Sequence, residues 1–266
     1  MGADRDVDPG AVVIAGRVAL ITAVLAIAAT VVSTAQADRV EGPFGRGAAQ
    51  VWLVLPQGRP RSVVVFGHGW KLAPPVPPLA WVDQFRPWLD HLASRGNAVV
   101  FPRWQLGAND SLGSARVLSY RLGLSTAFAR LHRPHVPVIA VGYSYGASLA
   151  FYYAANARRW RLPRPAAVDL VFPAGLILGT PLPPLAPAIR VLIQVGAQDT
   201  EAGAAGASSF WARLRGHPHA RKRYEVVASM PGLVATHAAP KQTGPAARRT
   251  FWQPLDTLIA AARTGR

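Results

Sequence analysis

A serine within a glycine motif is the strongest chemical signal in this sequence. The segment Gly142-Tyr143-Ser144-Tyr145-Gly146 fits the pattern G-x-S-x-G, follows a β-branched run and precedes an Ala-rich stretch. A tight turn between a strand and a helix lifts such a serine hydroxyl above a sheet, and the flanking glycines leave room for its strained backbone. The motif therefore predicts a nucleophile at Ser144. A glycine-rich turn with a packing serine is the structural alternative.

A nucleophilic serine needs a base, and the base needs an acid that orients it. Where the serine lies on a strand-to-helix turn of this kind, the three residues follow in the chain order serine, acid, histidine. Asp199 directly follows the expected strand 189–195. Catalytic groups gather at the carboxyl ends of parallel strands, which favours Asp199 over its nearest rival, Glu201. Asp169 falls at the start of another expected strand and Asp256 within the last expected helix, so neither suits this role.

His237 is the candidate base. It lies in a loop after the expected strand 224–227 and before the final helix, and such a loop can bring an imidazole onto Ser144 from outside the sheet. His217 and His219 flank a proline among several basic residues, a pattern typical of a solvated turn.

Ester hydrolysis develops negative charge on the substrate carbonyl oxygen, which requires N–H donors that are already in place. The backbone N–H of Tyr145, directly after the serine, is one expected donor. The N–H of Trp70, in the Gly-His-Gly-Trp turn after the expected strand 62–66, is the other. Trp70, Tyr143 and Trp104 are also expected to bind substrate by lining an apolar acyl pocket, although these aromatic side chains could equally pack in the core.

The elements that must position these groups alternate between β-branched runs and helical patterns. Strands are expected over residues 49–55, 62–66, 97–101, 137–141, 168–172 or 175–178, 189–195 and 224–227, and helices over 80–94, 111–131, 147–156, 208–214 and 249–263. The first strand alternates and is expected at an antiparallel edge, whereas continuous apolar runs are typical of strands buried on both faces. Together they predict one α/β domain, residues 38–266, with a mostly parallel sheet.

The order of these motifs resembles the α/β-hydrolase fold superfamily over about residues 49–263. The resemblance rests on the HGW turn, GYSYG, GAQDT and ATH. It is closest in look to the dienelactone hydrolase and bacterial cutinase-like (polyester hydrolase) group, where a glycine-aromatic pair such as Gly69-Trp70 shapes the oxyanion hole. Two departures stand out: the chain lacks the cysteines of the usual cutinase disulfide, and it has Tyr145 where that group tends to have Met.

The resemblance implies a serine hydrolase that cleaves carboxylic esters with a Ser144–His237–Asp199 triad and an acyl-enzyme intermediate. No cofactor or metal is expected, and the expected partner is a small-molecule or lipid-like ester. A thioester or a peptide would use the same parts.

Composition suggests one further class of function. The chain has 266 residues, no Cys, and 29 basic residues against 13 acidic ones, for a net charge of +16. A non-catalytic α/β-hydrolase-like protein that binds envelope lipid or polyanion through its arginines is therefore the alternative. The basic residues are scattered and no nucleic-acid-reading motif occurs, so nucleic acid is not an expected partner.

The N-terminal residues 1–37 read as a targeting segment. An apolar run, Val18–Ser33, follows Arg17 and precedes the A-x-A sequence Ala35-Gln36-Ala37. This arrangement is typical of a secretory signal and predicts an exported protein, secreted or held in the cell envelope. Aspartates outnumber arginine ahead of the apolar run, and residues 11–36 are long enough for a membrane anchor, which is the alternative.

Overall fold

The computed structural model describes residues 39–71, 79–107, 113–132 and 135–265. All of them belong to one compact unit, Ala37–Arg266. The signal peptide or anchor expected within residues 1–37 lies outside the described residues. Among the helices that are described, none is long and apolar enough to cross a membrane.

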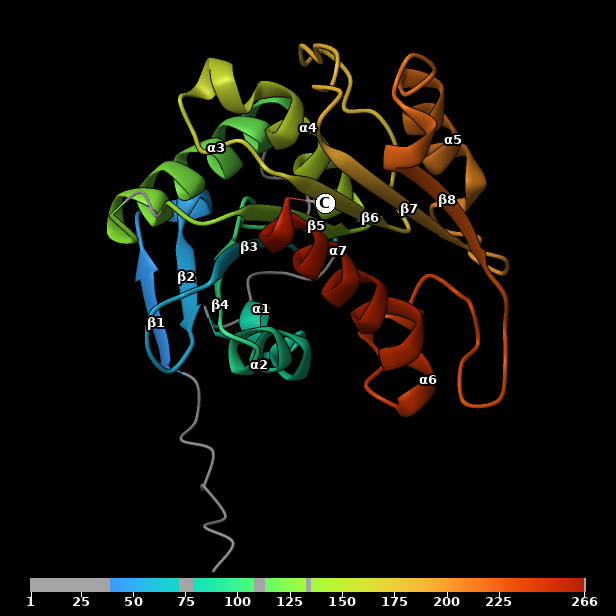
Figure 1. The fold of residues 1–266 in the computed structure, drawn as a ribbon, viewed down its shortest axis with the longest axis horizontal. Coiled ribbons are helices and arrows are strands. Elements are labelled where there is room, and N and C mark those ends of the chain that lie inside the picture. Colours follow the sequence, from blue (N-terminus) through green and yellow to red (C-terminus); the bar gives the residue numbers. More distant parts are fainter. Residues whose placement is uncertain (1–38, 72–78, 108–112, 133–134, 266) are drawn as a thin grey trace, which may run out of the picture. The chain divides into compact units, whose positions relative to one another are not determined.

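An eight-stranded sheet forms the centre of this unit, in the order β1-β2-β4-β3-β5-β6-β7-β8 (Figure 1). The strands are β1 (Arg39–Phe44), β2 (Val51–Leu55), β3 (Ser62–Gly67), β4 (Asn97–Pro102), β5 (Val138–Tyr143), β6 (Ala167–Val171), β7 (Arg190–Gly196) and β8 (Lys222–Val227). β2 runs antiparallel to both of its neighbours, and all other pairs are parallel. The expected mostly parallel sheet is confirmed.

Helices cover both faces of the sheet (Figure 1). They are α1 (Ala80–Asp83), α2 (Arg86–Ser94), α3 (Gly113–Arg130), α4 (Tyr145–Trp160), α5 (Gly203–Arg213), α6 (Pro245–Ala247) and α7 (Gln253–Thr264). Helices α3, α4 and α5 enclose one hydrophobic core, and α1, α2, α6 and α7 enclose the other.

The continuous apolar strands supply both cores at once. In β3, Val63 and Val65 face the core under α3–α5, whereas Val64 and Phe66 face the core on the α7 side. Successive side chains of a strand point to opposite faces, so a strand covered on both sides is apolar throughout. This requirement explains why the sequence patterns located the central strands well.

The edge of the sheet differs from expectation. β1 pairs with β2, so the strand expected at the edge is instead an interior strand with both neighbours antiparallel. β1 contains Gly42-Pro43 and its sequence RVEGPF shows no apolar alternation, which is why no pattern indicated it. Of the two alternatives near residue 170, β6 matches 168–172, and 175–178 lies in a loop.

Two expected helices are interrupted. The helix expected over 80–94 divides into α1 and α2 at Phe85, which leaves the helical region with φ −112° just ahead of Pro87. The helix expected over 249–263 begins with a π-helical turn, Arg248–Trp252, before α7. Proline within a helical pattern removes a donor and crowds the preceding turn, which explains the first interruption.

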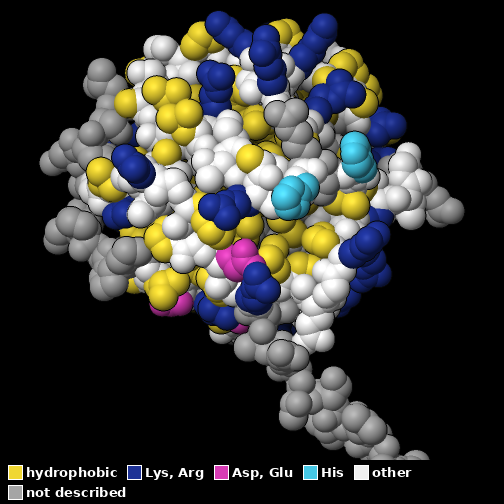
Figure 2. Space-filling view, turned by 90° about the vertical axis from the view of Figure 1, so that its left-hand side faces the viewer, with side chains coloured by type: hydrophobic (Ala, Val, Ile, Leu, Met, Phe, Trp, Pro, Cys, Tyr) yellow, Lys and Arg dark blue, Asp and Glu magenta, His cyan; other side chains and the backbone are white. Residues whose placement is uncertain are grey.

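Basic side chains are dispersed over the surface in view in Figure 2. On this face, the side of the molecule that carries β1 and α3 in Figure 1, the Lys and Arg side chains alternate with apolar and uncharged surface. They form no single continuous patch there. The large positive charge is therefore not gathered on this face into one docking surface.

Candidate active site

Ser144 occupies a strained turn between β5 and α4. Its backbone angles are φ 56° and ψ −123°, a region that a residue with a side chain rarely enters. A Cβ at Gly142 would lie 2.2 Å from the carbonyl oxygen of Gly146, and a Cβ at Gly146 would lie 2.4 Å from that of His68. Only glycine fits at either position, so the motif supplies the room that the turn needs.

The end of β6 and the loop after it hold this turn in place. The Ser144 N–H donates to the carbonyl of Val171 at 2.9 Å, and the Ala174 N–H donates to the carbonyl of Ser144 at 3.2 Å. Strained backbone persists only where its surroundings determine it, and these two hydrogen bonds provide that support.

Ser144, His237 and Asp199 form one hydrogen-bonded chain. The Nε2 atom of His237 lies 2.9 Å from the Ser144 hydroxyl oxygen, and its Nδ1 atom lies 2.8 Å from Oδ2 of Asp199. All three residues are buried, with exposed fractions of 9%, 7% and 7%. A carboxylate only accepts, so Nδ1 carries the hydrogen and Nε2 is free to accept from the serine hydroxyl.

Backbone donors fix the Asp199 carboxylate. Its Oδ1 atom accepts the N–H groups of Glu201 at 3.0 Å and Ala202 at 3.1 Å. The residue thus follows β7 and is held by the start of the next loop. Glu201, its rival, contributes only this N–H to the arrangement, and its own side chain is exposed at the cavity mouth.

Tyr143 holds the loop that carries His237. Its hydroxyl donates to the His237 carbonyl at 2.8 Å, and its ring centroid lies 5.0 Å from the imidazole. Burial raises the pKa of Tyr143, which keeps the hydroxyl protonated as a donor. Tyr143 was expected to bind substrate. It does line the cavity, but only 5% of its surface is exposed.

The turn after β3 leaves a backbone donor free beside the serine. Gln105 is fully buried and holds Lys71 from both sides, accepting its N–H at 3.0 Å and donating to its carbonyl at 3.2 Å. The Lys71 N–H is therefore occupied. Within the described part of the chain, the N–H groups of Trp70 and Tyr145 have no hydrogen-bond partner. These are the two donors that the sequence predicts for the oxyanion.

The buried side chain of His68 contacts backbone carbonyl groups within this turn and after β4. Its ring nitrogens lie 2.8 Å from the carbonyl oxygen of Gly69 and 2.6 Å from that of Arg103. The side chain is fully buried, and burial lowers the pKa of His68 to about 4. His68 is therefore a neutral structural residue at physiological pH.

Trp104 does not line the cavity, contrary to the sequence-based expectation. Its side chain is fully buried, stacked between Tyr145 and His68 with ring centroids 4.9 Å from each. It lies behind Tyr145, which lines the cavity. Trp70, by contrast, is 43% exposed and lines the cavity itself. Both residues have the same aromatic character in the sequence, which could not show which of them reaches the cavity.

The cavity beside Ser144 has a volume of about 570 Å³. One wall is aromatic and consists of Trp70 and Tyr145, with Arg116 above both rings at 5.6 Å and 5.4 Å from their centroids. Two lysines, Lys71 and Lys241, also line it. Sequence reasoning missed these cations and Gln105. The rarity of lysine in this arginine-rich chain was the only signal that could have indicated the two lysines.

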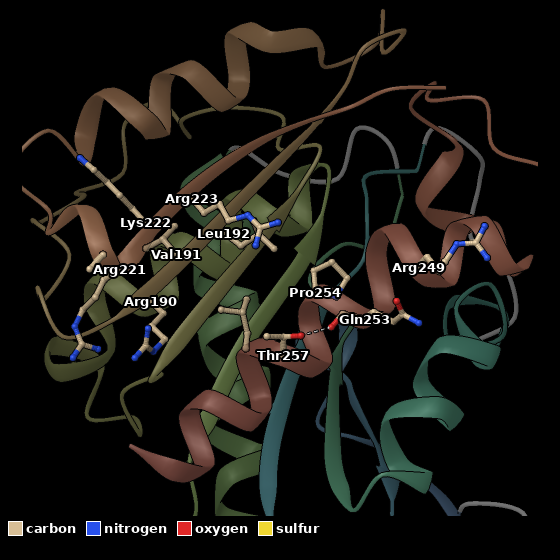
Figure 3. A pocket seen from close by; sticks show the side chains of 12 residues that line it. Arg190, Val191, Leu192, Arg221, Lys222, Arg223, Arg249, Gln253, Pro254 and Thr257 are labelled. Atoms are coloured by element: carbon tan, nitrogen blue, oxygen red, sulfur yellow. Dashed lines mark hydrogen bonds between the residues drawn. The ribbon is translucent and has the colours of Figure 1, made fainter. Parts of the chain in front are cut away.

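A second hollow, of about 490 Å³, lies between the starts of β7 and β8 and helix α7 (Figure 3). Its basic side chains extend in different directions in Figure 3 and do not converge on one point. Arg221 donates to the carbonyl of Ala188, and Lys222 donates to the carbonyl of Leu214. The hollow contains no His, Asp or Glu among its lining residues, so it lacks the side chains that most often act as general acid or base.

Within the described residues, no three His, Cys, Asp or Glu side chains are grouped so as to hold a metal ion. The site that the structure assembles beside the cavity consists of a serine, an imidazole and a carboxylate, with backbone donors next to them. That set is suited to nucleophilic acyl transfer.

Comparison with known proteins identifies the fold. No family model matches the sequence, and no curated protein matches it. Solved structures do match. Carboxyl esterase 2 from Tuber melanosporum has a TM-score of 0.63 at 15% identity, covering 86% of this chain and 89% of that one.

Two bacterial esterases are similar in the same way. Esterase B from Lactobacillus rhamnosis, inhibited by a tributyrin phosphonate, has a TM-score of 0.62 at 15% identity over 86% of this chain and 87% of its own. The butyrate-bound esterase Est2 from Thermogutta terrifontis has a TM-score of 0.60 at 16% identity, over 85% and 95%. The expected α/β-hydrolase fold is confirmed, whereas the cutinase-like group is not specifically supported.

Proposed function

We propose that this protein is a serine hydrolase that cleaves carboxylic esters through an acyl-enzyme intermediate. The observation that carries the proposal is the hydrogen-bonded chain from Ser144 through His237 to Asp199, which begins at a strained turn that projects into a cavity. The esterases with similar structures support the choice of ester substrates. A small-molecule or lipid-like ester fits a cavity with an aromatic wall.

Acylation begins when the Ser144 oxygen attacks the ester carbonyl carbon while Nε2 of His237 takes the hydroxyl proton. The carbonyl oxygen becomes negatively charged in the tetrahedral intermediate. The free N–H groups of Trp70 and Tyr145 are the donors that stabilise this charge. Collapse of the intermediate breaks the ester C–O bond, and His237 returns the proton to the departing alkoxide, which leaves as the alcohol.

Deacylation repeats the sequence with water. His237 takes a proton from a water molecule while the water oxygen attacks the acyl carbon. His237 then protonates the Ser144 oxygen as the carboxylic acid leaves. Asp199 stabilises the imidazolium in both steps and keeps the hydrogen on Nδ1. Its two backbone donors hold it in that position without a further side chain.

The alternative of a non-catalytic protein that binds lipid or polyanion is less well supported. A binding protein has no use for a buried serine, histidine and aspartate joined at hydrogen-bond distances. The basic side chains at the second hollow also point in different directions in Figure 3, and Arg223 there forms an ion pair with Glu225. Thioesters and peptides remain chemically compatible with the same machinery.

A serine-directed fluorophosphonate probe tests the proposal on the full-length protein. Peptide mapping should find the label on Ser144, and the Ser144→Ala variant should neither label nor hydrolyse a p-nitrophenyl ester. Ser148→Ala is the matched control, because Ser148 lies one turn further along α4 with its hydroxyl bonded to the Gly175 carbonyl. It should label normally. Hydrolysis that persists in Ser144→Ala would remove this serine as nucleophile.

A further inference from the structure

Lysine is rare in this protein but concentrated at the catalytic cavity. Of the 29 basic residues only Lys71, Lys222 and Lys241 are lysines. Lys71 and Lys241 line the cavity that contains Ser144 and His237. They come from separate parts of the chain, Lys71 from the loop after β3 and Lys241 from the end of the short helical turn Ala239–Lys241. The fold thus brings two distant lysines to one site.

Aromatic rings position both ammonium groups. The Nζ atom of Lys71 lies 4.5 Å from the ring centroid of Trp81, and that of Lys241 lies 5.8 Å from the ring centroid of Tyr143. Tyr143 in turn contacts the imidazole of His237. Cation–π contact of this kind holds an ammonium in place without neutralising its charge.

Among the residues that the structure describes, neither ammonium group forms an ion pair or donates a hydrogen bond. Lys71 is half-buried, and burial together with the nearby charge of Lys241 lowers the pKa of Lys71. An anion bound between the two groups would relieve both the desolvation and the repulsion.

The cavity therefore combines aromatic and cationic groups. Trp70 and Tyr145 supply aromatic surface with Arg116 over both rings, and the half-buried Lys71 and the exposed Lys241 supply ammonium groups. The serine lies in the same cavity, so a ligand can contact these groups while its carbonyl meets the nucleophile. Each ammonium is a compact positive charge with three donors, from which a carboxylate can accept.

We propose that the cavity selects esters that also carry a free carboxylate, which Lys71 and Lys241 bind while Ser144 attacks the ester carbonyl. This inference rests on the proposed ester hydrolysis and specifies its substrate class. The two lysines act as specificity residues through binding, so their contribution should appear in KM more than in kcat.

Matched substrates measure the preference. p-Nitrophenyl hexanoate and mono-p-nitrophenyl adipate share one acyl chain length and differ in the terminal carboxylate. Phenyl acetate and 4-acetoxybenzoate place the same difference on the alcohol side. In at least one pair the anionic ester should have the higher kcat/KM, and that pair identifies which side of the scissile bond lies toward the lysines. Added salt should reduce the preference by screening.

Charge variants assign the preference to named residues. Lys71→Met and Lys241→Met should each lower the ratio of anionic to neutral kcat/KM by roughly two- to fivefold, the range of a partly exposed ion pair. The Lys71 backbone is held by Gln105, so the loss of its side chain leaves the turn in place. Glu201→Gln, which removes the exposed carboxylate at the cavity mouth, should raise the ratio.

The third lysine provides the control. Lys222 lies at the second hollow, with its ammonium bonded to the Leu214 carbonyl. Lys222→Met removes the same charge from the protein as a whole but not from the cavity. It should leave the ratio unchanged, and a fall equal to that in Lys71→Met would attribute the preference to net charge and overturn the inference.

Binding without turnover separates this inference from the proposed function. Calorimetry with Ser144→Ala should detect monomethyl adipate, and binding should weaken in the Lys71→Met/Lys241→Met background. If wild type hydrolyses neutral esters but shows no anionic preference, the lysine inference fails and ester hydrolysis stands. If the anionic ester binds through the lysines but no ester is hydrolysed, the proposed function fails alone. Absence of both overturns both.

Discussion

Two buried aspartates, one within β6 and one in the loop after the neighbouring strand β7, have opposite surroundings. Asp199 comes three residues after β7 ends, and Asp169 lies in the middle of β6, paired with Val141 on one side and Leu192 on the other. Their exposed fractions are 7% and 0%. Asp199 contacts three hydrogen-bond donors, whereas neither carboxyl oxygen of Asp169 has a partner in the described structure.

The difference follows from position on the sheet. Inside a strand the backbone N–H groups are committed to the ladder, and Asp169 faces the same apolar core as Ala167 and Val171. Beyond the end of a strand the chain turns, and its free N–H groups can point at a carboxylate. A charged acid is therefore stable at the carboxyl edge but costly in the middle, and burial raises the pKa of Asp169 to about 8.

Removing the charge of Asp199 should have the largest effect. We expect Asp199→Asn to lower kcat/KM by about 10³- to 10⁴-fold, because an amide at this position can donate to Nδ1 and favour the wrong imidazole tautomer. Initial rates with a p-nitrophenyl ester provide the measurement. Asp169→Asn is the matched control, since it makes the same chemical change on the next strand and should keep wild-type kcat/KM.

The role of Asp169 should appear in stability instead. Its native pKa of about 8 lies above the ordinary aspartate value of 3.8, so between these pH values the folded chain keeps a proton that the unfolded chain has released. Stability from this group therefore falls as pH rises from about 4 to about 8. Urea unfolding should show that the free energy of unfolding of Asp169→Asn increases relative to that of the wild type as pH rises through this window. Parallel pH curves for the two proteins would contradict the assignment of a neutral Asp169.

Most of the candidate site was accessible from the sequence because its signals are local. The strained turn requires Gly142 and Gly146, which pointed to Ser144, and Asp199 follows shortly after an apolar strand. The expected chain order then indicated His237. The structure brings these three side chains together, and their catalytic roles stay a prediction. The central strands were equally visible, because burial on both faces makes each one continuously apolar.

Features that depend on contacts between distant segments could not be read in this way. Trp104 and Trp70 look alike in the sequence, yet Trp104 is fully buried behind Tyr145 and Trp70 lines the cavity. The clamp of Gln105 on Lys71 joins residues 34 positions apart without any motif. Asp169 was recognised as a poor catalytic candidate, but its lack of hydrogen-bond partners depends on three strands and α7 packing together.

His68 extends the comparison to a buried base, with the opposite sign. Its native pKa of about 4 lies below the ordinary histidine value of 6.5, so between these pH values the unfolded chain holds a proton that the folded chain lacks. Stability from His68 therefore falls as pH drops from about 6.5 to about 4. Within this window the contributions of His68 and Asp169 have opposite slopes and should cancel in the wild type.

A variant that removes one of these two groups should reveal the pH dependence of stability that the other group contributes. His68→Phe keeps stacking area against Trp104, and its stability should fall steadily from pH 4 to pH 8. The stability of Asp169→Asn should rise from pH 4 to pH 6.5 and then level off. Unfolding midpoints at four or more pH values distinguish these curves, and a variant that keeps the wild-type curve would show that its residue does not titrate as described.

The smallest expected effect concerns the hydrogen bond that holds the loop carrying His237. The Tyr143 hydroxyl donates to the His237 carbonyl, a single neutral hydrogen bond, whereas Asp199 contacts the imidazole itself. Tyr143→Phe keeps the ring against His237 and removes only that bond, so we expect a loss of about 1 kcal/mol in stability and a fall in kcat/KM of no more than about tenfold. The matched comparison is Tyr152→Phe, which removes a buried tyrosine hydroxyl that donates to the Ile177 carbonyl and accepts the Ile177 N–H, outside the loop that carries His237. It should cost at least as much stability while leaving kcat/KM unchanged. Equal activity losses in the two variants would mean that general destabilisation, and not the position of His237, sets the rate.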